Sequence, residues 1–119
     1  MYGVAFEGSS NQPLYSVHSD NLYYAVCYIS TRATILTIPA KVNCPTNWTM
    51  EYSGYLVAGY YNRNGRTTYE CVDSNPETIP GTSGSGNEAI LYHVEPHCGA
   101  LSCPPYDAQK ELTCVVCSR

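Results

Sequence analysis

The sequence Glu-Leu-Thr-Cys-Val-Val at residues 111–116 is a short stretch in which β-branched and apolar residues predominate. Val and Thr favour an extended backbone because their branched side chains restrict χ1 and pack well on a pleated surface. Six residues suit a strand and are few for a helix, which usually needs ten or more. The stretch therefore predicts a β-strand close to the C-terminus.

Earlier runs of the same kind are four to eight residues long and rich in Val, Ile, Thr or Tyr. They occupy residues 23–29, 32–38, 49–52, 67–72 and 89–95. Turn-forming residues separate them, and Asn64-Gly65 between two tyrosine-rich runs predicts a hairpin. Apolar residues nowhere recur at helical spacing. We expect an all-β fold, a small disulfide-bridged antiparallel domain with long loops.

The length and charge of the chain exclude several classes of protein. The 119 residues suit one domain, spanning 1–119, and carry a formal net charge of −4. A nucleic-acid binder needs clustered Lys and Arg to neutralise phosphates, so we expect no nucleic-acid partner. Apolar runs stay well below the roughly 18 residues of a spanning helix, so we expect no membrane insertion.

Seven cysteines set the expected compartment. They are Cys27, Cys44, Cys71, Cys98, Cys103, Cys114 and Cys117. So many in a short chain predict disulfides in an oxidising compartment, and the sequon Asn47-Trp48-Thr49 also favours secretion. The alternative is a zinc site, with Cys98, Cys103, Cys114 and Cys117 joined by His93 or His97. Only Cys114 and Cys117 have the spacing of a zinc knuckle, so we expect a secreted, extracellular protein.

Because seven is odd, at least one thiol lacks a partner within the chain. A leftover cysteine in a secreted protein often joins two chains, which predicts a disulfide-linked homodimer. The alternative is a buried free thiol, which behaves as a small hydrophobic side chain. The spacing of the cysteines does not decide between these two outcomes. It also does not show how the other six cysteines pair.

A short internal sequence repeat indicates two repeat-like units in the chain. Ala25-Val26-Cys27 is similar to Cys114-Val115-Val116-Cys117, and each follows an aromatic or apolar residue that precedes a Glu, in Phe6-Glu7 and Val94-Glu95. Tyr24 stands where the second copy has Cys114. Within the single domain, residues 1–30 then correspond to the tail of a repeat-like unit, and residues 31–119 to a complete unit.

Several motifs resemble the non-collagenous domain of invertebrate short-chain (C4-type) collagens. They are Ile38-Pro39-Ala40, Cys44-Pro45, Trp48, Glu51-Tyr52-Ser53-Gly54-Tyr55-Leu56, Cys71-Val72-Asp73, Asn75-Pro76-Glu77, Val94-Glu95, Cys98-Gly99, Cys103-Pro104-Pro105-Tyr106 and Thr113-Cys114-Val115-Val116-Cys117. The chain has no Gly-X-Y tract, so it cannot form a collagen triple helix. The resemblance implies a secreted, cysteine-bridged β domain of a marine invertebrate. Free-standing domains that look like it include calcium-dependent, galactose-binding lectins of sea anemones.

Oxygen-bearing side chains cluster where the fourth run ends. Ca²⁺ takes six to eight oxygen ligands, mainly carboxylates and carbonyls. Asp73, Asn75 and Glu77 are at alternate positions, so in an extended chain their side chains point to the same side. Pro76 restricts the backbone of the turn that carries them. Glu95-Pro96 offers a second arrangement of this kind. We predict Ca²⁺ as the cofactor and Asp73, Asn75, Glu77 and Glu95 as its ligands, although Asn75-Pro76-Glu77 also suits a plain turn.

A calcium ion of this kind can bind a sugar, because a vicinal diol replaces two of its waters. Neighbouring polar groups then bond to the hydroxyls, and an aromatic ring stacks on the apolar sugar face. The predicted sugar-binding residues are His97, Asn87, Glu88, Tyr92 and Trp48, with Tyr60, Tyr61 and Tyr69 as further candidate rings. Trp48 is better suited to packing in the core or covering a disulfide than to binding sugar.

The sequence thus favours a secreted calcium-dependent lectin for galactose-terminated glycans, and the choice of galactose comes from the resemblance. The alternative is a structural extracellular-matrix or assembly module that binds no sugar. An enzyme is not expected, since no nucleophile elbow, P-loop, dinucleotide fingerprint or zinc-protease motif is present.

Overall fold

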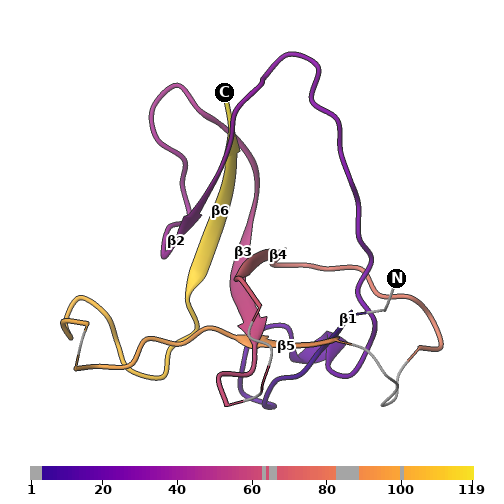
Figure 1. The fold of residues 1–119 in the computed structure, drawn as a ribbon, viewed down its shortest axis with the longest axis vertical. Coiled ribbons are helices and arrows are strands. Elements are labelled where there is room, and N and C mark those ends of the chain that lie inside the picture. Colours follow the sequence, from indigo (N-terminus) through magenta and orange to yellow (C-terminus); the bar gives the residue numbers. More distant parts are fainter. Residues whose placement is uncertain (1–3, 63, 65–66, 83–88, 100) are drawn as a thin grey trace.

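The computed structural model describes residues 4–62, 64, 67–82, 89–99 and 101–119. Across these residues the chain forms a single mixed sheet and one 3-10 turn, η1 (Tyr15–Val17) (Figure 1). The strands are β1 (Val4–Phe6), β2 (Ile35–Pro39), β3 (Thr49–Gly59), β4 (Glu70–Asp73), β5 (Ala89–His93) and β6 (Thr113–Ser118). The predicted all-β class is confirmed.

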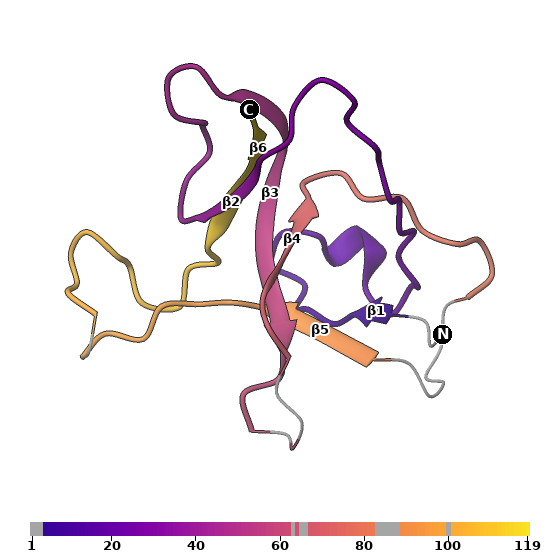
Figure 2. The same ribbon diagram turned by 45° about the horizontal axis from the view of Figure 1, so that its top comes forward.

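The long strand β3 organises the sheet (Figure 2). Gly54 pairs with both Asp73 of β4 and Cys114 of β6, so these strands lie on opposite edges of β3. Val57 pairs with both Glu70 and His93, which places β5 opposite β4 in the same way. One edge of β3 therefore carries β4, and the other carries β6 and then β5. Between the strands of the described chain, every pairing is antiparallel except that of β1 with β5.

Gly54 is required where three strands meet. A Cβ atom built on this residue would lie 1.8 Å from the carbonyl oxygen of Val72. No side chain fits at that separation, so β4 can approach β3 closely only because this position is glycine.

Leu56 and Val57 face opposite sides of the sheet, because successive strand residues alternate. Val57 packs with Phe6, Leu14, Val17 and Leu22, which we call the N-terminal core. Leu56 packs with Cys71, Cys114 and Val116, which we call the disulfide core. The first 30 residues thus supply a strand and most of the N-terminal core to the same sheet as residues 31–119.

Three disulfides join six of the cysteines, and all seven cysteines lie in the described part of the chain. The pairs are Cys44–Cys117, Cys71–Cys114 and Cys98–Cys103. Cys114 and Cys117 are three residues apart in β6, so their side chains lie on opposite faces of the strand. One bridge therefore covers each face of this buried strand. The zinc alternative is wrong, since its four cysteines are all in disulfides.

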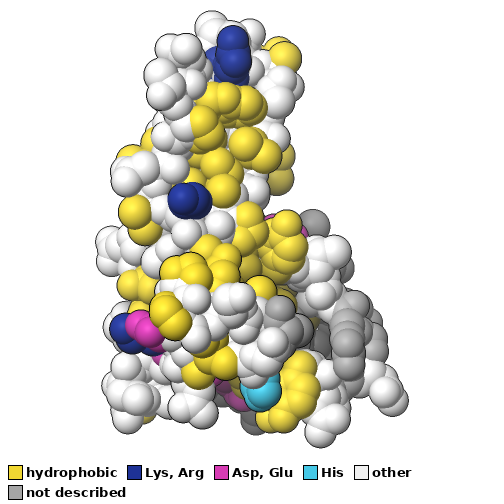
Figure 3. All heavy atoms as spheres, turned by 90° about the vertical axis from the view of Figure 1, so that its left-hand side faces the viewer, with side chains coloured by type: hydrophobic (Ala, Val, Ile, Leu, Met, Phe, Trp, Pro, Cys, Tyr) yellow, Lys and Arg dark blue, Asp and Glu magenta, His cyan; other side chains and the backbone are white. Residues whose placement is uncertain are grey.

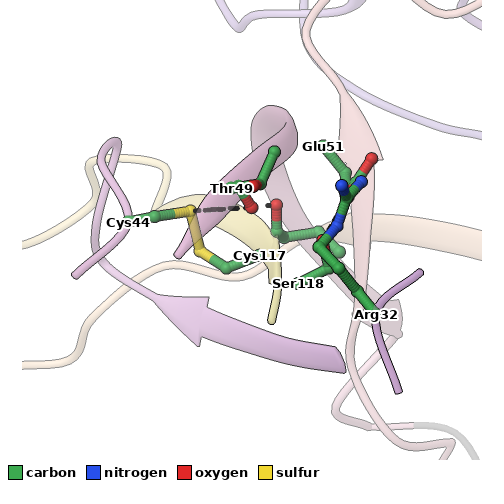
Figure 4. Close-up of a disulfide and its surroundings, with 7 residues drawn as sticks. Arg32, Cys44, Thr49, Glu51, Cys117 and Ser118 are labelled. Atoms are coloured by element: carbon green, nitrogen blue, oxygen red, sulfur yellow. Dashed lines mark hydrogen bonds and ion pairs between the residues drawn. A yellow bond between two sulfur atoms is a disulfide. The ribbon is translucent and has the colours of Figure 1, made fainter. Parts of the chain in front are cut away.

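A polar clamp holds the start of β3 to the C-terminus (Figure 4). The register between β3 and β6 shifts between Met50 and Tyr52, which leaves Glu51 in a bulge. Arg32 Nε donates to Ser118 Oγ over 2.5 Å, and an Arg32 guanidinium nitrogen donates to Glu51 Oε1 over 2.7 Å. Ser118 also donates to Glu51. The hydrogen bonds from Ser118 and Arg32 lower the pKa of the Glu51 carboxyl.

The strand predicted at residues 23–29 is wrong, because these residues pair with no strand. Their Tyr and Val content favours extended backbone, but a strand also needs a neighbour to complete its hydrogen bonds. Cys27 in this segment is the unpaired cysteine and is exposed, so the buried-thiol alternative is wrong as well. Conversely β1, only three residues long, was not expected. β3 and β4 are antiparallel neighbours whose pairing ends at Val57 and Glu70, and Gly65 of the predicted Asn64-Gly65 turn lies outside the described residues.

The sheet leaves hydrophobic side chains uncovered beside β2. On the face seen in Figure 3, such side chains spread over the upper part with charged groups at few points. Exposed residues of this region include Ile35, Leu36, Val42 and Met50. In the described segments, no helix is both long and apolar enough to cross a membrane.

Candidate functional site

A pocket of about 980 Å³ opens at the end of β3 next to β5. It is lined by residues 7–9, 58–61 and 92–97, together with Gln12, His18, Thr67 and Gln109. We call it the β3–β5 pocket. Four separate parts of the chain meet here because β1 pairs with β5, and β5 with the end of β3.

Tyrosines form one side of the pocket. The rings of Tyr60 and Tyr92 lie 5.0 Å apart at 54°, and Tyr61 follows at 4.8 Å from Tyr60. The Tyr92 hydroxyl donates to Glu7 Oε2 over 2.6 Å. Tyr60 is 39% exposed and Tyr61 is 72% exposed, so these rings remain accessible to a ligand.

The carboxylate of Glu95 lies on the same pocket and is held from the N-terminal segment. Gln12 Nε2 donates to Glu95 Oε1 over 2.8 Å, and the side-chain oxygen Oε1 of Gln12 accepts from Ser9 N over 2.8 Å. These two hydrogen bonds hold Oε1 of Glu95 in place. The lone pairs of the carboxylate that they do not use can accept hydrogen bonds from a ligand in the pocket.

His93 supports the pocket from beneath. Its ring lies 4.9 Å from Phe6 and 5.6 Å from Tyr55, and Nε2 donates to the Pro13 carbonyl over 2.9 Å. Burial lowers the pKa of the His93 imidazole, against a smaller upward effect of Glu111. The ring is therefore neutral at pH 7, with its proton on Nε2. His18 and the exposed His97 line the pocket as well, and His18 Nδ1 accepts from Gly8 N over 3.2 Å.

The predicted calcium ligands do not lie together. Asp73 ends β4, and its Oδ1 accepts from Asn75 N over 2.8 Å in a tight turn that Glu77 follows. Glu95 follows β5 on the opposite edge of β3, so two strand spacings, roughly 10 Å, separate the two backbones. In the described ranges no three His, Cys, Asp or Glu side chains form a group that could hold a metal ion. The donors are suitable for Ca²⁺, but these four residues do not fit one shared ion.

The predicted sugar-binding residues also separate. Tyr92 and His97 line the β3–β5 pocket. Trp48 immediately precedes β3, whose eleven residues place it about 35 Å along the strand from Gly59. It does not line this pocket. Asn87 and Glu88 lie outside the described residues.

Several polar residues of the pocket were not predicted from sequence, and the two that matter most here are Glu7 and Gln12. In the sequence, Glu7 stands out only as part of the short internal repeat. Both were distant in sequence from the other candidates, and the parallel pairing of β1 with β5 brings them in. The sequence feature that points to this pairing is the apolar run Val4-Ala5-Phe6 before Glu7, which is too short to be recognised as a strand.

The pocket combines flat aromatic surface, which stacks on apolar faces, with two carboxylates and three imidazoles, which accept hydrogen bonds from hydroxyls. Polyhydroxylated, uncharged ligands match that combination. No protein-family model matches the chain, and no solved structure matches it significantly.

Proposed function

We propose that the protein is a carbohydrate-binding domain, and that the β3–β5 pocket is its saccharide site. The observation that carries the proposal is the meeting of Tyr60 and Tyr92 with the carboxylates of Glu7 and Glu95 in one open pocket. A pyranose has hydroxyls at its rim and C–H groups on its faces. The carboxylates accept hydrogen bonds from the hydroxyls, and a tyrosine ring packs on the C–H groups of one sugar face.

The pocket is suited to binding in advance of the ligand. Glu7 is held by Tyr92 and Glu95 by Gln12, so the acceptors need little ordering when a sugar arrives. Its volume of about 980 Å³ lies at the upper end of the range of small-molecule sites, roughly 300–1,000 Å³. This size favours a terminal sugar with part of the residue that follows it.

Galactose and calcium enter the proposal from the resemblance to sea anemone lectins. We propose terminal galactose-type sugars as the ligands and Ca²⁺ as the cofactor that the domain needs. The Asp73-Asn75-Glu77 turn supplies oxygen donors of the right kind, away from the pocket. Its role in the proposal is to bind the ion, and the contacts to sugar are assigned to the pocket residues.

We propose that the protein works outside the cell. Three disulfides in 119 residues are typical of an oxidising compartment. Binding without turnover is part of the proposal, so incubation with a chromogenic galactoside should release no product.

A glycan array probed with and without calcium tests the proposal. We expect retention of galactose-terminated glycans in calcium and a loss of at least tenfold for Tyr60→Ala, since it removes a stacking ring. Tyr69→Ala is the matched control, because Tyr69 is half exposed but does not line the pocket. Binding to no glycan under either condition would favour the matrix-module alternative.

A further inference from the structure

Residues 23–29 present apolar side chains to solvent. Val26 is 103% exposed and Tyr28 is 91% exposed, while Tyr23 and Tyr24 are more than half exposed. From 23 to 31 the segment carries no charged residue, although the chain as a whole is acidic. Two copies can therefore approach at this segment without charge repulsion.

The backbone of this segment is held at both ends and unpaired between them. Tyr23 N donates to the Glu77 carbonyl over 3.1 Å, and Thr34 exchanges 3.0 Å bonds with Arg119. Within the described chain, residues 24–33 make no backbone-to-backbone hydrogen bond. Figure 1 shows them rising from near β1 to the C-terminal end of β6, along the outside of the sheet. A row of free N–H and C=O groups of this kind is a template for pairing with another strand.

Cys27 lies in the middle of this segment. It is exposed and is the only one of the seven cysteines without a disulfide, in a chain whose other six are oxidised. Under the same conditions its thiol can form a disulfide only outside its own chain.

We propose that residues 23–29 of two copies pair as antiparallel strands about a two-fold axis at Cys27, and that the two Cys27 side chains form a disulfide. In this register Cys27 lies opposite Cys27, and Val26 lies opposite Tyr28 of the second copy. Opposed residues of an antiparallel pair have Cα atoms about 4.5–5.5 Å apart, within the range of about 4.4–6.8 Å that a disulfide spans.

A second copy suits the segment because the register is self-complementary. A two-fold interface must match its own surface, and here the pairing of Val26 with Tyr28 occurs twice. A β-branched residue opposite an aromatic one is a favourable cross-strand pair. Ala25 falls opposite Ile29, so small and large side chains alternate beside the disulfide.

The covalent step balances with a glutathione disulfide as oxidant. One Cys27 thiolate attacks it and releases a glutathione thiolate, leaving a mixed disulfide. The Cys27 thiolate of the second copy then attacks the Cys27 sulfur and releases the second glutathione. Two protein thiols are oxidised and one glutathione disulfide is reduced to two thiols.

The test is equilibration of the purified chain in a buffer of reduced and oxidised glutathione, with dimer measured by non-reducing electrophoresis and mass spectrometry of the linked peptides. We expect a Cys27–Cys27 peptide in wild type and none in Cys27→Ser. Val26→Asp should lower the dimer formation constant on the order of tenfold, since both cross-strand pairs are lost. Val42→Asp is the matched control, because this half-exposed valine lies outside the segment.

The proposal is overturned if Cys27 is recovered only as the glutathione mixed disulfide, if the dimer is linked through another cysteine, or if Val26→Asp dimerises as well as wild type. Chains secreted with Cys27 bound to a different protein would overturn it too. None of these outcomes bears on sugar binding by the β3–β5 pocket, which is measured separately on Cys27→Ser.

Discussion

The hydroxyl of Tyr92 donates a 2.6 Å hydrogen bond to Glu7, a residue 85 positions earlier in the chain. This bond joins the last part of β5 to the turn that follows β1, and it fixes one wall of the β3–β5 pocket. The parallel pairing of β1 with β5 makes the bond possible, since Phe6 lies opposite Leu91. A saccharide site at this place therefore depends on the N-terminal residues.

Tyr92→Phe keeps the ring and removes the donor to Glu7. We expect sugar affinity to fall about tenfold, because Glu7 loses the bond that holds its carboxylate in place before the sugar binds. The variant should also lose roughly 1.5 kcal/mol of unfolding free energy in urea, because the same bond stabilises the fold. Calorimetric titration with a galactoside measures the affinity, and an unchanged value would show that Glu7 does not contact the sugar.

Removing calcium separates the two proposed sites. EDTA should abolish retention on a galactose column while the circular dichroism spectrum is preserved. Asp73→Asn should raise the calcium concentration needed for retention, because it removes a carboxylate from the turn. Glu95→Gln should instead weaken sugar binding at saturating calcium. Retention in EDTA would rule out the calcium requirement.

Stability should fall in mild acid because of His93. Its pKa is lowered in the folded protein, so below the ordinary value of 6.5 the unfolded chain binds a proton that the folded chain does not. Stability therefore rises with pH up to about 6.5 and is lost as pH falls below it. Thermal melts from pH 7.5 to 5 measure this dependence.

The control for that experiment compares two histidine variants. His93→Phe keeps a ring against Phe6 and Tyr55, and should flatten the part of the slope that His93 causes. The exposed His97 provides the matched change His97→Gln, which should leave the slope as in wild type. Equal slopes in all three proteins would contradict the assignment to His93.

The two disulfides of β6 should stabilise the fold more than the third. Cys44–Cys117 closes a separation of 73 residues, whereas Cys98–Cys103 closes one of 5. Chain-entropy estimates give about 4 kcal/mol for the former and about 2 kcal/mol for the latter. Urea unfolding of the two double Cys→Ser variants measures both values, and a larger loss for the Cys98–Cys103 pair would contradict the expectation.

The strands that could be predicted from sequence are those with a local signal. β6 and β5 follow β-branched or apolar runs, and their predicted ranges overlap the strands found. Residues 23–29 carry the same signal but find no partner, because pairing is decided by the whole sheet. β1 carries too little signal to be recognised. Local composition therefore predicted fold class better than it predicted which strands exist.

The candidate site was less predictable for a related reason. Asp73, Asn75 and Glu77 stand close together in the sequence where β4 ends, but the sequence could not show that Glu95 leaves the other edge of β3. Tyr92 and His97 were placed in the pocket by the pairing of β5 with β3. Glu7 and Gln12 joined them through the N-terminal core, which no local pattern reveals.

The most direct measurement is a nuclear magnetic resonance titration of the isotope-labelled protein with a methyl galactoside in calcium. Saccharide binding in the β3–β5 pocket predicts saturable shifts for Tyr60, Tyr92 and Glu95, and none for Trp48 at the far end of β3. Saturable shifts confined to Trp48 or to the Asp73-Asn75-Glu77 turn, or no shifts at millimolar sugar, would contradict it.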